Sequence, residues 1–516
     1  MKASKTASTA TLFGHPKGLF YLFFAELWER FSFYGMKALL LLYMTQHLLY
    51  TDEASFGILS AYMSLVYITP LWGGILADKI LGYRKSILLG GILMALGHFL
   101  LSFETPIFFY GSLALIILGN GFFKPNISSF VGALYKDNPH QRDAGFTIFY
   151  LGINLGAAIA PLICAWIAAL YGWHYGFMLA GFGMLLGLAF FQQGLKSNVF
   201  GAAGQLPNAT RYHQKIAGLN QGQWVAIGAV LTTPIFAAII FFHEYEHYLI
   251  LLASAFLILY ILFILSKVST IERGRLIVVI YFTLLSTLFA ALFEQTGSSL
   301  VLFADRNVHL IGINAAQTNS INATFIVLLA IPFSMLWAWL SRIGKNPAAP
   351  FKFSFGLILL GLAAIIFGRS AISADALAQT SMIYLIIGYF VLTVGELFLS
   401  PIGLSKVTEL SPKQYISFIM GVWFSSYFYG HYFAGKVAQL TVSNGASNNL
   451  FDTFGSAIKL ITGLTQDIAI HKGPAFEQLY AYVSVYVSFG IITLSIGCLA
   501  LLLAPIMTRL MHLENR

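Results

Sequence analysis

The chain has 516 residues, of which 58% are hydrophobic and only 9% are charged, and its mean hydropathy is +0.78. This composition excludes a soluble globular protein with an ordinary polar surface and indicates a protein that crosses a membrane many times. The excess of 29 Lys and Arg over 20 Asp and Glu follows membrane topology, as described below, and gives no reason to expect a nucleic-acid partner.

Fourteen apolar segments are long enough to span a bilayer as helices. Six come first, a polar stretch at 196–223 follows, then a shorter pair, and then six more. The segments lie at 19–46, 56–77, 86–103, 107–134, 142–168, 174–195, 224–242, 248–266, 275–303, 318–340, 353–369, 380–408, 414–440 and 480–507. We therefore expect an all-α polytopic membrane protein with two six-helix bundles and two extra helices between them.

The same pattern divides the chain into five parts. They are a cytoplasmic N-terminus at 1–17, an N-terminal bundle at 18–196, a linker with two transmembrane helices at 197–272, a C-terminal bundle at 273–510 and a cytoplasmic tail at 511–516. The first apolar segment is too long and too charged for a signal peptide, so we expect it to stay as the first helix. We expect the longest outer loop, 441–479, to be an ordered loop, with a short interfacial helix as the alternative.

The distribution of Lys and Arg sets the orientation. With both termini inside, 21 of the 29 Lys and Arg residues fall in inner connections, five fall in outer connections, and three lie within the membrane. This bias follows the positive-inside rule for fourteen spans. We expect a multi-pass protein of the cytoplasmic (inner) membrane, with the bilayer as its surroundings.

The first segment carries four charges that need an explanation. Glu26, Glu29, Arg30 and Lys37, together with Phe33, follow one stripe of a helix at intervals of three, one, three and four residues. Each unpaired charge facing lipid would cost about 2.5–3.5 kcal/mol. The stripe is therefore expected to face protein or water.

The end of the second segment, GGILADKILGYRK at 73–85, resembles the loop signature of the major facilitator superfamily. Its paired glycines allow close helix contact. Asp78 can cap a helix start or pair with Arg84 in a contact that breaks in another conformation. The alternative is a positively charged inner turn with no further role.

Several longer motifs resemble the proton-dependent oligopeptide transporter family, also written POT or PTR2, of the same superfamily. ELWERFSFYG at 26–35 matches that family's ExxERFxxxG signature nearly residue for residue. The other matching stretches are GNGFFKPNISSF at 119–130, FTIFYLGINLGA at 146–157, FEQTGSSL at 293–300, GELFLSPIGLS at 395–405 and MGVWF at 420–424. The resemblance covers both halves and implies the major facilitator fold, and the extra pair of spans resembles prokaryotic members.

Three further charges lie alone within apolar spans: Lys124 in the fourth, Glu294 in the seventh and Glu396 in the tenth. Attraction between the two halves would favour closure on one side, and protonation of a carboxylate would weaken it. The resemblance implies that Lys124 faces Glu396 near the cytoplasmic gate and that Glu294 belongs to the proton-linked gating network. Glu26, Glu29 and Arg30 would form the proton-responsive cluster. The alternative is a set of purely structural ion pairs.

A second group matches positions that the family uses around peptide. Asn154 offers a donor and an acceptor to a peptide bond, and the aromatic residues give apolar walls with polar tips. Lys37 would hold the substrate carboxylate and Glu396 its amino group. The predicted binding residues are Tyr34, Lys37, Tyr67, Asn154, Glu396, Trp423 and Phe424. For any one of the aromatic residues, simple packing is the alternative.

The chain departs from the family pattern at several positions. Lys37 stands where Arg is usual, so the contact with a carboxylate would be a point charge in place of a bidentate fork. Ser60 stands where some members carry a histidine, which argues against a histidine-based proton relay. The other departures are Phe33 for Tyr, Ala290 for Trp and Ala323, after Asn322, for Pro.

These observations predict proton-coupled symport of di- and tripeptides by alternating access, with peptides and protons as the partners. A same-fold transporter of another small solute, such as nitrate, an amino acid or a peptide-like drug, is the alternative. A channel fits poorly because paired opposite charges do not make a continuous pore. We expect no enzyme activity, no cofactor, no metal site and no obligate protein partner, since the spans contain no nucleophile–base pair, Walker sequence or metal-ligand spacing.

Overall fold

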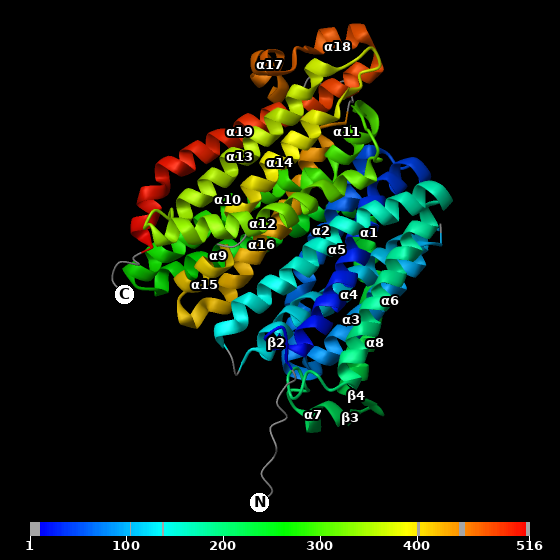
Figure 1. Ribbon diagram of the computed structural model, residues 1–516, viewed down its shortest axis with the longest axis vertical. Helices are drawn as coiled ribbons and strands as arrows, with labels where there is room; N and C mark the ends of the chain where they lie inside the picture. The colour runs from blue at the N-terminus through cyan, green and yellow to red at the C-terminus, as the bar shows by residue number, and fades with distance from the viewer. Residues whose placement is uncertain (1–10, 104, 137–138, 400–402, 443–448, 512–516) are drawn as a thin grey trace, which may run out of the picture. The chain divides into compact units, whose positions relative to one another are not determined.

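A computed structural model describes residues 11–103, 105–136, 139–399, 403–442 and 449–511 (Figure 1). Fourteen helices in this described part have 18 or more residues, as the six–two–six pattern predicts. Eleven helical runs, one of which contains two of these helices, are long and apolar enough to cross a membrane. The first long helix is not among them, because Glu26, Glu29 and Arg30 lie close together within it.

Parts of four predicted segments lie outside the described residues. These parts are 1–10 of the N-terminus, 400–402 of the span predicted at 380–408, 443–448 of the outer loop and 512–516 of the tail.

Contacts divide the chain into two compact units. Unit 1 comprises Met1–Leu40 and Leu65–Phe241, and unit 2 comprises Leu41–Ser64 and Phe242–Arg516. Helices α1 (Lys17–Leu42) and α2 (Asp52–Leu76) therefore each contribute residues to both units. The boundaries predicted from the sequence for the bundles and the linker stay predictions.

Unit 1 is built from long helices joined mostly by short connections. After α1 and α2 they are α3 (Gly82–Leu101), α4 (Pro106–Leu134), α5 (Arg142–Tyr171), α6 (Trp173–Lys196) and α8 (Gln221–Phe241), with the short α7 (Ala209–His213) before α8. Two small antiparallel hairpins accompany them, β1 (Thr11–Leu12) with β2 (His15–Pro16) and β3 (Lys215–Ile216) with β4 (Leu219–Asn220). A five-residue π-helix, Ala77–Leu81, joins α2 to α3.

Helices α3 and α4 approach each other through glycines. A Cβ atom on Gly90 would lie 2.5 Å from the carbonyl oxygen of Gly119, and one on Gly119 would lie 2.6 Å from that of Gly90. Two helices can come this close only where neither carries a side chain, which is the usual way that membrane helices maximise packing.

The polar stretch at 196–223 is hydrogen-bonded to the start of α3. Arg84 donates from Nε to the carbonyl oxygen of Ala203 (2.8 Å) and from Nη2 to that of Gly201 (2.6 Å). The Arg84 guanidinium thus donates to the backbone of the polar stretch, and in the described part of the chain no ion pair joins it to Asp78. The predicted Asp78–Arg84 pair, which is expected to form in one conformation and break in another, stays a prediction.

Unit 2 contains the remaining long helices. They are α9 (Glu246–Lys267), α10 (Thr270–Phe293), α12 (Asn319–Arg342), α13 (Ala349–Arg369), α14 (Met382–Leu399), α16 (Ile416–Gln439) and α19 (Pro474–Leu510), with the shorter α11 (Ser299–Asn307), α15 (Gly403–Leu410), α17 (Asn449–Thr462) and α18 (Gln466–Lys472). Strands β5 (Val308–His309) and β6 (Thr380–Ser381) pair in parallel. Helix α10 begins at a capping box formed by Ser269 and Glu272.

Glycines also bring α13 and α19 together, and the two helices run side by side in Figure 1. A Cβ atom on Gly361 would lie 2.7 Å from the carbonyl oxygen of Gly490, and one on Gly490 would lie 3.0 Å from that of Gly361. Unit 2 has a second reciprocal glycine contact, between Gly356 of α13 and Gly395 of α14, where a Cβ atom on either glycine would lie 2.9 Å from the carbonyl oxygen of the other.

Two predicted elements of unit 2 differ from the structure. The seventh span is not continuous: α10 ends at Phe293, a 3₁₀ turn covers Glu294–Gly297, and α11 follows. Of the tenth predicted span, 380–408, the structure describes α14 up to Leu399 and α15 from Gly403, and 400–402 lie outside the described residues. The outer loop contains two helices, α17 and α18, so the preferred expectation of an ordered loop was wrong.

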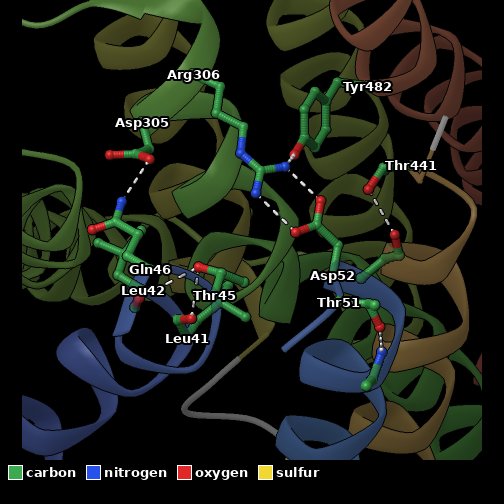
Figure 2. A network of polar contacts seen from close by, with 12 residues as sticks. Leu41, Leu42, Thr45, Gln46, Thr51, Asp52, Asp305, Arg306, Thr441 and Tyr482 are labelled. Atoms are coloured by element: carbon green, nitrogen blue, oxygen red, sulfur yellow. Dashed lines mark hydrogen bonds and ion pairs between the residues drawn. The ribbon is translucent and has the colours of Figure 1, made fainter. Parts of the chain in front are cut away.

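A polar network joins the first turn of α2 to α11 within unit 2 (Figure 2). The guanidinium of Arg306 donates to both carboxylate oxygens of Asp52, and its Nη1 also lies 3.4 Å from the Tyr482 hydroxyl. Beside it, Gln46 donates to Asp305 over 2.9 Å. These contacts explain why residues 41–64 cluster with unit 2, although the chain on both sides of them belongs to unit 1.

Candidate functional site

The charged stripe of α1 is buried within unit 1. Glu26, Glu29 and Arg30 are each no more than 2% exposed. Arg30 donates to Glu29 through Nε and, over 2.6 Å, through Nη2. The same Nε lies 3.2 Å from Oε1 of Glu26. One guanidinium therefore contacts two carboxylates, and the charges of the stripe face protein in this part of α1.

The two carboxylates differ in the number of hydrogen bonds that they accept. Both oxygens of Glu29 accept from Arg30, and Asn120 of α4 also reaches Oε1 of Glu29 at 3.5 Å. In contrast, Oε2 of Glu26 is buried and accepts no hydrogen bond from the described residues. A buried carboxylate oxygen without a donor is costly as an anion. Oε2 of Glu26 is therefore a suitable place for a proton.

Lys124 of α4 lies near this cluster. Its Nζ is 4.6 Å from the centre of the Tyr67 ring, within the range of a cation–π contact, and its charge acts electrostatically on Glu26. Helix α4 continues through Pro125, which immediately follows Lys124. Unit 1 thus brings together two carboxylates, a guanidinium and an ammonium.

The other predicted residues of unit 1 lie on α1 and α5. Tyr34 and Lys37 are half-buried, and the Tyr34 ring meets that of Phe33 edge to face at 5.5 Å. The guanidinium carbon of Arg30 lies 5.4 Å from the centre of the same Phe33 ring. Asn154 is 7% exposed and its amide donates to the carbonyl oxygen of Tyr150, one turn earlier in α5.

In unit 2, Glu396 of α14 is held by a neighbouring helix. Asn322 of α12 donates from Nδ2 to Oε2 of Glu396 and to Oγ1 of Thr393, both over 3.0 Å. Thr393 in turn donates to the backbone of Tyr389. The Asn322 amide therefore orients the Glu396 carboxylate, and the Thr393 hydroxyl fixes the position of that amide.

The other predicted carboxylate of unit 2, Glu294, lies at the break between α10 and α11. Its Oε2 is 3.7 Å from Nδ1 of His431, which is 2% exposed and comes from α16. Glu294 and Glu396 also interact electrostatically. The two isolated carboxylates predicted from the sequence thus belong to one charged region of unit 2.

The two aromatic residues predicted in unit 2 have different surroundings. Trp423 is 5% exposed, packs against Gly403 and contacts the Phe353 ring edge to face at 6.4 Å. Phe424 is 48% exposed. The roles of both as walls of a peptide site stay predictions.

Several polar residues of these clusters were missed by the sequence reasoning. Asn120 lies four residues before Lys124 on the same helix, so the spacing already placed it on one face with that cation. Asn322 and His431 are polar residues inside apolar segments, which is itself an indication of function in a membrane protein.

Lys124 and Glu396 belong to different units, so their predicted pairing stays a prediction. Among the described residues, no group of three or more His, Cys, Asp or Glu side chains has the arrangement needed to hold a metal ion.

Comparison of sequences gives one family match and several relatives. The profile of the POT family (PTR2) matches residues 84–454. An uncharacterized transporter, YclF, of Bacillus subtilis is 36% identical, covering 81% of this chain and 87% of the relative. The peptide transporter YePEPT of Yersinia enterocolitica is 35% identical (84% and 90%). The dipeptide and tripeptide permease B of Xenorhabdus bovienii is 29% identical (99% and 99%).

The fold is also similar to solved structures. A crystal structure of a peptide transporter POT in complex with sulfate superposes with a TM-score of 0.80 at 32% sequence identity, covering 97% of each chain.

Proposed function

This chain belongs to the POT family of multi-pass membrane transporters, and from that premise we propose that it is a proton-coupled symporter of di- and tripeptides. Relatives described as a peptide transporter and as a dipeptide and tripeptide permease support the substrate class. The major facilitator fold supports transport by alternating access between two bundles. The proposed bundles are 18–196 and 273–510, with the linker 197–272 between them.

The buried cluster on α1 carries the proposal. A carboxylate pair that shares one guanidinium gives little net stability, because burial of charges costs about as much as their attraction returns. Its presence is better explained by a change of protonation during transport. A proton on Oε2 of Glu26 would release that carboxylate from Arg30, leaving Arg30 to Glu29 alone.

The substrate proposed for this site has one ammonium, one carboxylate and a neutral amide between them. Lys37 would bind the carboxylate and Glu396 the ammonium, while Asn154 would bind the peptide group. The apolar walls would come from Tyr34, Tyr67, Trp423 and Phe424. In the same proposal, Lys124, Glu294 and Glu396 respond to the proton and control the opening of the gate.

The membrane is proposed to be the cytoplasmic (inner) membrane, with both termini on the cytoplasmic side. The support is the uneven distribution of Lys and Arg, 21 in inner connections against five in outer ones. The mechanism needs no cofactor, since the proton gradient supplies the free energy.

Competition among substrates tests the substrate class. Purified protein in liposomes is loaded with unlabelled dialanine, and entry of labelled dialanine by exchange is measured with competitors outside. We expect dialanine and trialanine to compete, and nitrate, free alanine and tetra-alanine to compete weakly or not at all. If nitrate or free alanine competed and the two peptides did not, the result would contradict the proposal and favour the alternative of another solute.

A further inference from the structure

Helix α16 places a buried histidine beside the carboxylate at the break in the seventh span. His431 is 2% exposed, and its Nδ1 lies 3.7 Å from Oε2 of Glu294. Glu294 is the first residue of the 3₁₀ turn that separates α10 from α11. An imidazole and a carboxylate thus form a close pair inside unit 2.

The backbone around His431 is fixed from two sides. Gly430 packs directly against Ala290 of α10, where any side chain on the glycine would collide with the alanine methyl group. One turn later, Gln295 donates from Nε2 to the carbonyl oxygen of Ala434 over 3.0 Å. On one side of His431 α16 thus contacts α10, and on the other side it contacts the 294–297 turn, so the packing of these elements sets the position of the imidazole.

Helix α2 supports the same segment. The hydroxyl of Ser60 donates to the carbonyl oxygen of His431 over 3.2 Å, and Gly435 packs against the Ser60 side chain. The expectation against a histidine-based relay considered only Ser60 of the second helix, whereas here the second helix contributes a hydroxyl and the imidazole comes from α16.

Other titratable groups lie around the pair. On the Glu294 side, Glu396 of α14 and Tyr427 of α16 interact electrostatically with Glu294. On the other side, Glu246 of α9 is 8% exposed and interacts with Lys436 of α16.

The remaining helices packed on α16 add further groups. Helix α2 also contributes Ser64, which donates to the α16 backbone at Phe428. Helix α10 contributes Ser286, whose hydroxyl accepts from Ser426. Helix α15 carries an ion pair between Lys406 and Glu409. The His431–Glu294 pair is thus the one imidazole–carboxylate contact among these groups.

Resting on the proposed function, we propose that His431 is the proton partner of Glu294 in transport. In the transfer step, the Nδ1–H bond of an imidazolium breaks and an O–H bond forms on Oε2 of Glu294. A charged pair becomes a neutral pair with no change in total charge, so the step can occur in a buried site. At 3.7 Å the atoms attract but do not form a good hydrogen bond. Transfer therefore requires the His431 and Glu294 side chains to come closer than they are in this conformation, and a change in the packing of α16 on the 294–297 turn would control it.

Two replacements of the histidine test this role. His431→Asn and His431→Gln keep polar groups but cannot carry a proton. In proteoliposomes, we expect both variants to retain dialanine exchange without a gradient. Their proton-driven uptake between about pH 5 and pH 8, where imidazoles titrate, is expected to lose the wild-type pH dependence or to move its midpoint by about one pH unit or more. His247→Gln, an exposed histidine of α9, is the control and should keep the wild-type profile.

The carboxylate provides the second arm of the test. In a Glu294→Gln background, His431→Asn should change the pH profile little further, because the pair is already broken. A wild-type pH profile in His431→Asn would overturn the proposal. Equal loss of exchange and driven uptake with an unchanged profile would also overturn it, since that result indicates a purely structural role.

A measurement on the native histidine covers the case in which the replacements do not fold. In protein with ¹⁵N-labelled histidine, Glu294→Gln should shift the pH titration of one buried imidazole, and unchanged titration of all histidines would contradict the pairing. This experiment requires no transport. It therefore separates failure of the His431–Glu294 pair from failure of the proposed peptide symport, which wild-type uptake reports.

Discussion

Arg30 is shared unequally between its two carboxylates, and in the proposed function this inequality makes Glu26 the carboxylate that responds to a proton. Glu29 accepts two hydrogen bonds from the guanidinium, whereas Glu26 receives only the shared Nε contact. If Glu29 loses its charge, the whole attraction of Arg30 falls on Glu26. Glu26 would then stay ionised, and the response to a proton would be lost.

We therefore expect Glu29→Gln to separate binding from coupling. The variant should retain dialanine exchange in proteoliposomes but lose accumulation driven by an inward proton gradient. Glu409→Gln is a matched control, because Glu409 forms a partly exposed pair with Lys406 and lies outside the proposed cluster. Undiminished driven uptake by Glu29→Gln would remove Glu29 from the coupling mechanism.

Lys37 is the proposed contact for the substrate carboxylate. A hydrogen bond to a charged group contributes about 1.5–3 kcal/mol, so Lys37→Ala should weaken competition by dialanine about 10- to 100-fold. Dialanine amide, which lacks the carboxylate, should be affected much less. Lys345→Ala, on an exposed connection, is the control. Equal weakening of both ligands would indicate that Lys37 supports the site without binding the carboxylate.

At this scale the sequence was informative wherever a charge lay in an apolar span. The spacing on α1 predicted that Glu26, Glu29 and Arg30 share one face of the helix, because i, i+3 and i+4 positions are neighbours there. It did not predict that Asn120 and Asn322 orient Glu29 and Glu396. Those contacts join different helices, and the packing of helices decides which residues meet.

For whole helices too, the sequence predicts local structure better than it predicts contacts between distant segments. Apolar length predicted all fourteen long helices, since a bilayer sets the length of a span. The break at Glu294–Gly297 was missed because that stretch contains no proline and remains apolar on both sides. The helices α17 and α18 were underestimated because they pack against α19, which provides stability that local sequence does not reveal.

The close contact of α3 and α4 gives a prediction at the scale of elements. Gly90→Ala would place a methyl group against the carbonyl oxygen of Gly119, and overpacking of this kind typically costs about 1–3 kcal/mol. We expect a lower Tm in detergent, measured by loss of the monodisperse peak after heating. Gly111→Ala on α4 meets no atom within 4 Å and should leave Tm unchanged or raise it. An unchanged Tm for Gly90→Ala would show that the helices can separate without cost.

At the scale of the molecule, the chain divides into two units that do not follow the order of the sequence. Residues 41–64 cluster with unit 2, and the Asp52–Arg306 pair in Figure 2 is one of the polar contacts that join them to it. The positive-inside distribution predicted which ends of the helices share a side of the membrane. It did not predict this pair, because both residues lie in connections where charge alone is unremarkable.

A double-mutant cycle tests the strength of that pair. Asp52→Arg and Arg306→Asp each place like charges together and should lower Tm and transport. Together they restore opposite charges, so we expect a coupling energy within about 0.5–3 kcal/mol. The matched cycle on the more exposed Lys406–Glu409 pair should give about 0–1 kcal/mol. Simple addition of the two single effects at Asp52 and Arg306 would mean that the contact contributes no stability.

Proton-driven accumulation tests the central claim most directly. Purified protein in liposomes is given labelled dialanine with an inward proton gradient and an inside-negative potential. A potential of 100 mV supplies about 2.3 kcal/mol per proton charge, enough for roughly 50-fold accumulation. We predict that the inside concentration will rise well above the outside concentration and fall to equality when a protonophore is added. Equal concentrations with and without the gradient would contradict proton-coupled symport.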